Sequence, residues 1–290
     1  MRDNRIKSAL DSLLAARSIR YLANDPLSFC HRYHDPADRE VAAVIASSFA
    51  YGAVGIIFRT LEKIFAELGE SPRRFAERFD PKKGLRIFRG FKHRFNDEYD
   101  LCALLWHIRR MLEEEKSIER FFLRFHDKKH QDVTEALNGY SAAARSTDYQ
   151  PVFGRKALPK SFLFLFPAPF SGSACKRLCM FLRWVARPDD GVDLGLWRGV
   201  SQAQLIIPVD THIHRISRYI GLSARKTADW SAANEITAAL RRLDPGDPVK
   251  YDFALAHLGI SDKCDGNNRA VCSLCGIMEI CSKSGSIDMT

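Results

Sequence analysis

Four cysteines near the C-terminus have the spacing of a metal centre. Seven, two and five residues separate them in turn: Cys264, Cys272, Cys275 and Cys281. Thiolates this close in sequence can wrap one centre, either a tetrahedral zinc ion or a [4Fe-4S] cluster held by four cysteines. Zinc modules usually have two Cys-x2-Cys pairs or paired histidines, whereas this segment has one pair with two long arms. We therefore predict a [4Fe-4S] cluster, with zinc as the alternative.

Asp210 stands between an apolar run and a helical pattern. Residues 205–209 are apolar, and Ile213, Ile216 and Ile220 then mark one face of a helix. This place predicts an N-cap, where a carboxylate accepts backbone N–H bonds and gains from the helix dipole. The aspartate can serve as a cap alone, or it can also act on a substrate.

Lys176 follows a turn rich in proline, serine and glycine, residues 167–174, and lies in the first turns of a predicted helix. A helix N-terminus after such a turn can bind a phosphate, here beside Gly172 and Ser173. Lys176 and Arg177 can then be phosphate contacts at the surface. Alternatively, Lys176 is an amine nucleophile, because burial and a neighbouring cation favour a neutral amine.

Positive charge is concentrated in two segments without acidic residues. Lys and Arg number 44 against 35 Asp and Glu, a net charge of +9. Residues 149–188 contain seven cations and no acid, and residues 211–228 contain four, among them Arg215. Such segments can form one face that neutralises phosphates, or they can be ordinary solvated helix faces. We favour the anion-binding face.

The chain is predicted to be all-α, since apolar residues recur at spacings of three and four between short turns. Ser71 and Asp247, each followed by proline, are predicted N-caps. Residues 41–58 carry no charge over 18 positions. Serines and glycines interrupt this stretch, so we predict a buried core helix and not a membrane span.

Composition indicates a folded protein in a reducing compartment. Of 290 residues, 46% are hydrophobic, and eight cysteines are too few for a disulfide-stapled domain. No signal-like leader opens the sequence, so we expect a cytoplasmic protein. The cysteines outside the C-terminal group are expected to be structural: Cys30, Cys102, Cys175 and Cys179.

The order of these features resembles endonuclease III and the helix-hairpin-helix DNA glycosylase superfamily. The lysine-bearing helix is followed by residues 209–212, then 244–245, then 257–260, then the four cysteines. Residues 39–48 likewise resemble the first buried helix of the barrel domain in that superfamily. More narrowly, residues 172–178, 191–197 and 207–212 are similar to a bacterial family called domain of unknown function 2400 (DUF2400).

The resemblance implies two all-α domains with DNA across the cleft between them. A helical barrel would comprise residues 41–187, and residues 1–40 with 188–290 would form the second domain, which carries the cluster loop. Lys176 would attack the sugar C1′, displace a damaged base and permit strand cleavage. Asp210 would activate the lysine or stabilise the developing positive charge. The cluster would be structural, and the protein would act as a nucleoid-associated monomer.

Predicted nucleic-acid contacts come from the turn, from the lysine-bearing helix and from the helix after Asp210: Gly172, Ser173, Arg177, Arg183, His212 and Arg215. The usual glycine-rich hairpin of the superfamily is replaced here by residues 167–172. Asp189, Asp190 and Asp193 lie in a longer insertion, where they can line a pocket or repel DNA. Phe49 and Tyr51 stand where endonuclease III probes the duplex with a glutamine, and both fit a core role better.

Two functions remain open from the sequence. The first is a DNA glycosylase with associated lyase activity on an oxidised or otherwise damaged base. The second is a non-catalytic iron–sulfur protein that binds nucleic acid, in which Lys176 and Arg177 only hold phosphate. The sequence does not distinguish DNA from RNA as the partner.

Overall fold

The computed structural model describes residues 2–16 and 19–283, and this part of the chain is mostly helical. The longer helices are α1 (Arg2–Ala16), α2 (Pro36–Phe49), α3 (Val54–Leu68), α6 (Glu98–Glu115), α8 (Thr134–Ser146), α11 (Lys176–Ala186), α12 (Thr211–Tyr219), α13 (Trp230–Leu243) and α14 (Asp252–Ile260). The shorter ones are α4 (Pro72–Glu77), α5 (Pro81–Ile87), α7 (Ile118–Leu123), α9 (Gln150–Phe153), α10 (Lys160–Leu163) and α15 (Arg269–Cys272). The 3-10 helices are η1 (Ile19–Asn24), η2 (Pro26–Arg32), η3 (Pro169–Ser171), η4 (Gln202–Gln204) and η5 (Met278–Ile280). Strands β1 (Lys92–His93) and β2 (Asn96–Asp97) pair antiparallel. The predominance of helices confirms the predicted all-α class.

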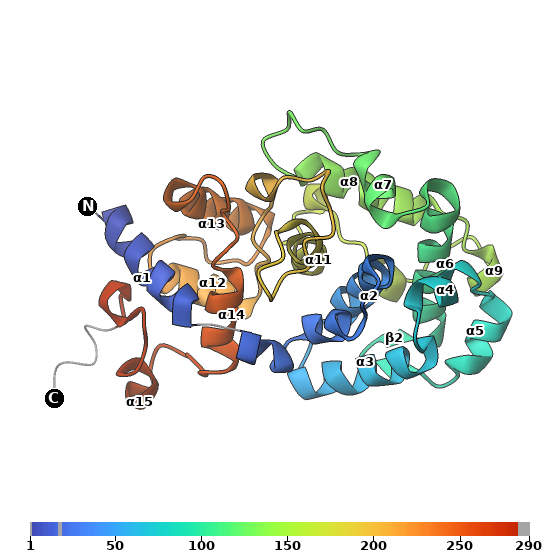
Figure 1. Cartoon of the computed structure of the whole chain (residues 1–290), viewed down its shortest axis with the longest axis horizontal. Coiled ribbons are helices and arrows are strands. Elements are labelled where there is room, and N and C mark those ends of the chain that lie inside the picture. The colour runs from blue at the N-terminus through green and yellow to red at the C-terminus, as the bar shows by residue number, and fades with distance from the viewer. Residues whose placement is uncertain (1, 17–18, 284–290) are drawn as a thin grey trace.

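The two ends of the chain meet on one side of the molecule. Figure 1 shows α1 beside α12, α13 and α14, with α2 to α9 on the other side and α11 between the two groups. Helix α1 packs against α13 and η5, and α2 packs against η2 and α11. The predicted boundaries at residues 41 and 187 stay a prediction.

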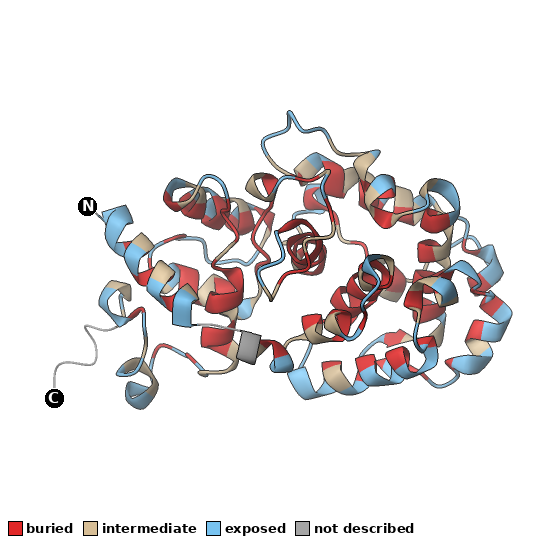
Figure 2. Ribbon diagram, viewed as in Figure 1, coloured by how far each residue is buried: buried red, intermediate tan, exposed pale blue. Residues whose placement is uncertain are grey.

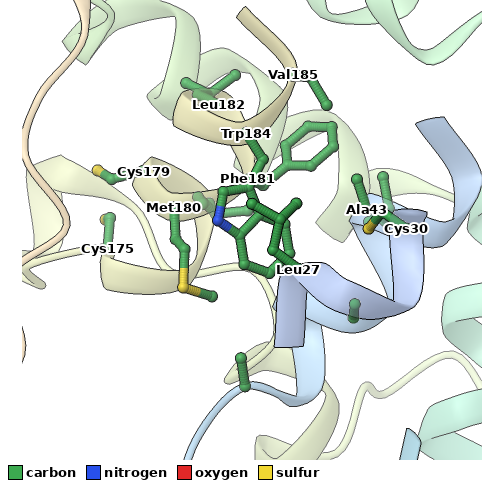
Figure 3. Close-up of a cluster of buried hydrophobic side chains, with 14 of the residues drawn as sticks. Leu27, Cys30, Ala43, Cys175, Cys179, Met180, Phe181, Leu182, Trp184 and Val185 are labelled. Atoms are coloured by element: carbon green, nitrogen blue, oxygen red, sulfur yellow. The ribbon is translucent and has the colours of Figure 1, made fainter. Parts of the chain in front are cut away.

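Helix α2 is the buried centre of the fold. Asp35 caps it by accepting a hydrogen bond from the Ala37 backbone N–H at 2.8 Å, and Pro36 begins the helix. Small residues such as Ala42 and Ala43 let η2 and α11 approach closely. The buried residues in Figure 2 are concentrated in α2 and α11, and Figure 3 shows α11 side chains, among them Trp184, beside Leu27 of η2.

The uncharged stretch 41–58 is two helices and not one. Helix α2 ends at Phe49 and α3 begins at Val54, and Gly52 in the connection has a φ of +101°. That left-handed backbone is unfavourable for other residues, so Gly52 suits the turn that connects the two helices. Among the described helices, none is both long and apolar enough to cross a membrane.

One of the two predicted proline-linked caps is correct. Ser71 caps α4, where its hydroxyl oxygen accepts a hydrogen bond from the Arg74 N–H at 3.2 Å. The prediction for Asp247 is wrong, because α14 begins only at Asp252. The Asp247 carboxylate instead accepts a hydrogen bond from the Arg187 Nε at 2.9 Å. Neutralising a buried guanidinium outweighs capping at this position.

Buried His107 on α6 predicts a loss of stability in acid. Its ring packs among aromatic rings, the nearest being Phe166 at 5.2 Å between centroids. Burial lowers the pKa of His107 to about 3. Below the unfolded-state pKa of about 6.5, the unfolded chain therefore takes up a proton that the folded chain does not. The stabilisation is complete above that value and is lost as the pH falls towards 3.

We expect His107→Gln to reduce the pH dependence of the unfolding free energy by up to about 1.4 kcal/mol per pH unit between pH 6 and 4. Urea titrations at several pH values measure this slope. If the variant has the same slope as the wild type, whatever its stability at pH 7, then His107 is not the cause of the loss of stability in acid.

Candidate functional site

One large cavity brings Lys176 and Asp210 together, although 33 residues separate them in the sequence. Its volume is about 940 Å³. The walls come from the α2–α3 connection, the turn before α11, the start of α12, α14 and the chain near Asp25. The two residues that were predicted to carry the chemistry therefore face the same space.

The Lys176 amine is held at the end of α2. Its Nζ donates a hydrogen bond to the backbone oxygen of Ala50 at 3.2 Å, and the side chain is half-buried. Helix α11 begins at Lys176, so the preceding Cys175 is its N-cap and not a helical residue. Gly172 has a φ of +78°, and its carbonyl accepts a hydrogen bond from the Trp230 N–H at 3.0 Å. This bond anchors the turn before the lysine to the start of α13.

Asp210 is the N-cap of α12, as predicted. Its Oδ1 accepts hydrogen bonds from the backbone N–H groups of His212 and Ile213, both at 2.9 Å. Within the described chain, Oδ2 has no hydrogen-bond partner. Capping therefore occupies one oxygen only, and the second is free to act in the cavity.

Asp252, at the start of α14, was not identified from the sequence. It is buried, lines the cavity and forms an ion pair with Arg183. Burial raises the pKa of Asp252 to about 6, and the charges of Asp210 and Lys176 also act on it. The available signal was an acidic residue within a short run that is otherwise apolar or aromatic, residues 251–256, since a buried acid requires a partner.

Arg183 is buried and lines the cavity, and its predicted contact with nucleic acid stays a prediction. Its side chain is 3% exposed and pairs with Asp193 as well as Asp252. Arg187, from the same acid-free segment, pairs with Asp193, Asp190 and Asp247. Two of the seven cations of residues 149–188 thus pair with carboxylates from outside the segment. Asp193 lines no open pocket and does not repel DNA, because it is fully buried between the two guanidinium groups.

Arg177 is also buried. Its guanidinium donates hydrogen bonds to the backbone oxygens of Ser48, at 2.8 Å, and Phe164, and it stacks on the Phe164 ring at 3.9 Å. Burial lowers the pKa of Arg177 to about 10. The alternative of a phosphate contact at the outer surface is therefore wrong for this residue, which lines the cavity, and its predicted contact with nucleic acid stays a prediction.

The remaining predicted contacts divide between the cavity and the cysteine loop. Gly172, Ser173 and His212 line the cavity. Arg215 donates hydrogen bonds to the backbone oxygen of Cys264 and to His212 Nδ1, the latter at 3.3 Å. Arg215 therefore ties α12 to the cysteine loop.

The aromatic residues of the α2–α3 region have different places. Phe49 is fully buried in the core, as expected. Tyr51 is half-buried and lines the cavity, with its ring 5.1 Å from that of Phe164. Tyr51 thus packs against the core and also forms part of the cavity wall.

The four C-terminal cysteines line one small apolar pocket, together with Ile216 and Tyr219 of α12. None of these cysteines is in a disulfide. Across residues 2–16 and 19–283, no three His, Cys, Asp or Glu side chains lie close enough together to hold a single metal ion. A [4Fe-4S] cluster separates its thiolates more widely, because each binds a different iron. The donor set and the shared pocket fit such a cluster.

The other four cysteines are buried and free, which agrees with a structural role. Cys175 and Cys179 lie beside Met180 on α11 (Figure 3). Burial raises the pKa of Cys175 to about 12, so its thiol is a poor nucleophile despite its place next to Lys176.

Comparison with known proteins gives one match. No curated protein and no solved structure matches the chain. The sequence profile of the family described as "Protein of unknown function (DUF2400)" matches residues 25–261, which include the cavity residues and stop short of the cysteine loop. The chain therefore belongs to the DUF2400 family.

Proposed function

We propose that this protein is a DNA glycosylase with associated lyase activity, which excises a damaged base. The observation that carries the proposal is the shared cavity of Lys176 and Asp210, a lysine amine and a carboxylate with a free oxygen. Its volume of about 940 Å³ is ample for a nucleotide turned out of the duplex. The place of action would be the nucleoid.

The reaction requires a neutral Lys176 amine. Its Nζ forms a bond to C1′ of the sugar while the glycosidic C1′–N bond breaks, and the base leaves with that electron pair and takes up a proton. Opening of the sugar ring gives a protonated Schiff base. Loss of a proton from C2′ then expels the 3′ phosphate by β-elimination, and hydrolysis of the Schiff base regenerates the amine.

Two carboxylates are placed to assist. Asp210 can accept the lysine proton through Oδ2 and stabilise positive charge at C1′. Asp252, held by Arg183, adds a second acidic group to the same cavity. Burial raises the pKa of Asp252 above its usual range, so this carboxyl holds a proton more readily than an exposed aspartate.

The test is a panel of duplexes, each with one oxidised, deaminated or alkylated base, incubated with the wild-type protein. We expect base release or strand cleavage for at least one lesion and a covalent adduct after borohydride reduction. Salt-sensitive binding to DNA without release, cleavage or adduct formation on any substrate would instead establish a non-catalytic binding protein. A parallel set of RNA substrates separates the two nucleic acids.

Asp210→Asn separates catalysis from helix capping. Asparagine caps a helix nearly as well as aspartate, so we expect the unfolding free energy to change by less than about 1 kcal/mol. The excision rate should fall at least about 10-fold, because the charge is lost. Asp35→Asn, at the N-cap of α2 and outside the cavity lining, is the matched control and should retain full activity. If Asp210→Asn and the wild type excise the base at equal rates, Asp210 serves only as a helix cap.

We further propose that Cys264, Cys272, Cys275 and Cys281 hold a [4Fe-4S] cluster. When bound, such a group would cross-link the loop and fix it against α12. We expect the purified protein to be brown and to contain iron and acid-labile sulfide, and Cys272→Ser to lose both. Cys179→Ser, a buried thiol outside the loop, should keep them. A colourless wild type with stoichiometric zinc contradicts the cluster and supports the zinc alternative.

A further inference from the structure

Most of the net charge of the chain lies in one short segment away from the residues discussed above. Residues 73–94, here called the basic segment, contain nine Lys and Arg against Glu77 and Asp80. This is a net charge of +7 out of +9 for the whole chain. Because the two acids interrupt the run, a search for acid-free stretches passes over it.

The structure leaves these cations exposed. The basic segment forms α4, α5 and β1, next to α3 at the outer edge of the molecule (Figure 1). Eight of its cations are exposed: Arg74, Arg78, Lys82, Lys83, Arg86, Arg89, Lys92 and Arg94. In the described chain, none of the eight pairs with a carboxylate. The ninth, Arg73, pairs with Glu77 at 2.8 Å.

Three phenylalanines of the segment point the other way. Phe79, Phe88 and Phe91 are buried, so they hold α5 on the core while the cations face solvent. Asp80 caps α5 by accepting a hydrogen bond from the Lys83 N–H at 2.8 Å, and it neutralises none of the side chains. The result is a field of unneutralised positive charge, which repels itself unless an anionic partner is present.

The segment ends at the cavity. The Arg94 guanidinium lies 5.9 Å from the centre of the Tyr51 ring, and Tyr51 lines the cavity. The Tyr51 hydroxyl donates a hydrogen bond to the backbone oxygen of His93 at 3.1 Å. The adjoining Phe95 is 45% exposed and lies 4.8 Å from Phe164, another cavity residue, between ring centroids. The basic segment thus ends beside the cavity, at a part of its wall that is formed by aromatic rings.

We propose that the basic segment binds the phosphate backbone of the nucleic acid that supplies the nucleotide to the cavity. The proposal rests on the proposed function for the identity of the ligand. Phosphates along a strand suit a row of cations, and the rings of Phe95 and Phe164 suit stacking with bases next to the target. An anionic membrane fits less well, because a membrane-binding helix presents a broad apolar face to the lipid, whereas α5 exposes one large apolar side chain, Ile87, among its cations.

The test compares two triple variants with the same change in charge. Lys82→Gln/Lys83→Gln/Arg86→Gln removes cations of the basic segment. Arg120→Gln/Lys128→Gln/Lys129→Gln removes exposed cations elsewhere. Binding to a fluorescent 30-base-pair duplex without a lesion is measured by anisotropy at several salt concentrations, and circular dichroism checks the fold of each variant.

We expect the first variant to bind at least about 10-fold more weakly at low salt, with a slope of log K against log salt reduced by about 2 to 3. The second variant should match the wild type. The proposal would be overturned if all three proteins had the same slope of log K against log salt. It would also be overturned if both variants lost the same amount of DNA affinity. A first variant that loses binding to phosphatidylserine vesicles and keeps its DNA slope would overturn it as well.

This measurement does not depend on catalysis, because the duplex carries no lesion. A reduced slope together with an inactive wild type would reject the glycosylase and keep the binding surface. An active wild type together with an unchanged slope in the first variant would keep the glycosylase and reject the binding surface.

Discussion

Lys176→Ala is expected to lose the borohydride-trapped DNA adduct by at least about 100-fold, because the reaction has no other amine at C1′. The side chain is half-buried and reaches into the cavity, where its Nζ is held by Ala50. DNA binding should remain, since the lysine contributes one charge among many. The adduct is quantified by gel electrophoresis on whichever lesion the wild type excises.

A second cavity lysine supplies the control. Lys160, at the start of α10, also lines the cavity but is exposed. We expect Lys160→Ala to trap as much DNA as the wild type. If Lys160→Ala loses the adduct and Lys176→Ala keeps it, the nucleophile has been assigned to the wrong lysine. If both variants trap DNA normally, the amine lies elsewhere.

The largest effect on stability is expected for Asp193→Ala, which should lower the unfolding free energy by about 3 to 5 kcal/mol. Asp193 is fully buried and pairs with both Arg183 and Arg187. Its removal leaves two buried guanidinium groups with fewer partners, and desolvated cations are costly when unpaired. Urea unfolding at neutral pH measures the loss.

The control for this prediction is an ion pair at the surface. Glu113 pairs with Arg109 and Arg110 at 2.7 Å, and all three side chains are partly exposed. Glu113→Ala should cost no more than about 1 kcal/mol. A similar small loss for Asp193→Ala would show that Arg187 is adequately held by Asp190 and Asp247 and that the buried pairs add little.

Local signals in the sequence predicted the local features of the site. The N-cap role of Asp210 depends only on the residues that flank it, and the structure shows the two backbone hydrogen bonds that the pattern implies. The shared pocket of the four cysteines likewise follows from their spacing. Such features need no knowledge of the rest of the chain.

Partners distant in sequence could not be predicted in this way. Arg183 is 69 residues from Asp252, and nothing near either residue in the sequence indicates the ion pair. A charged residue looks the same in a sequence whether it is solvated or buried, so the burial of Arg177 and Arg183 could not be predicted. The break after Phe49 was missed because residues 41–58 are uniformly uncharged, although Gly52 marks the turn.

Helix α12 joins the two candidate centres. Its nine residues span about 13 Å, with Asp210 at one end and Tyr219 against the cysteine loop at the other. The Tyr219 hydroxyl donates to Asp265, and Arg215 bonds to Cys264. Because one short helix contacts the cysteine loop at one end and carries the cavity carboxylate at the other, we expect a rearrangement of the loop to alter the position of Asp210.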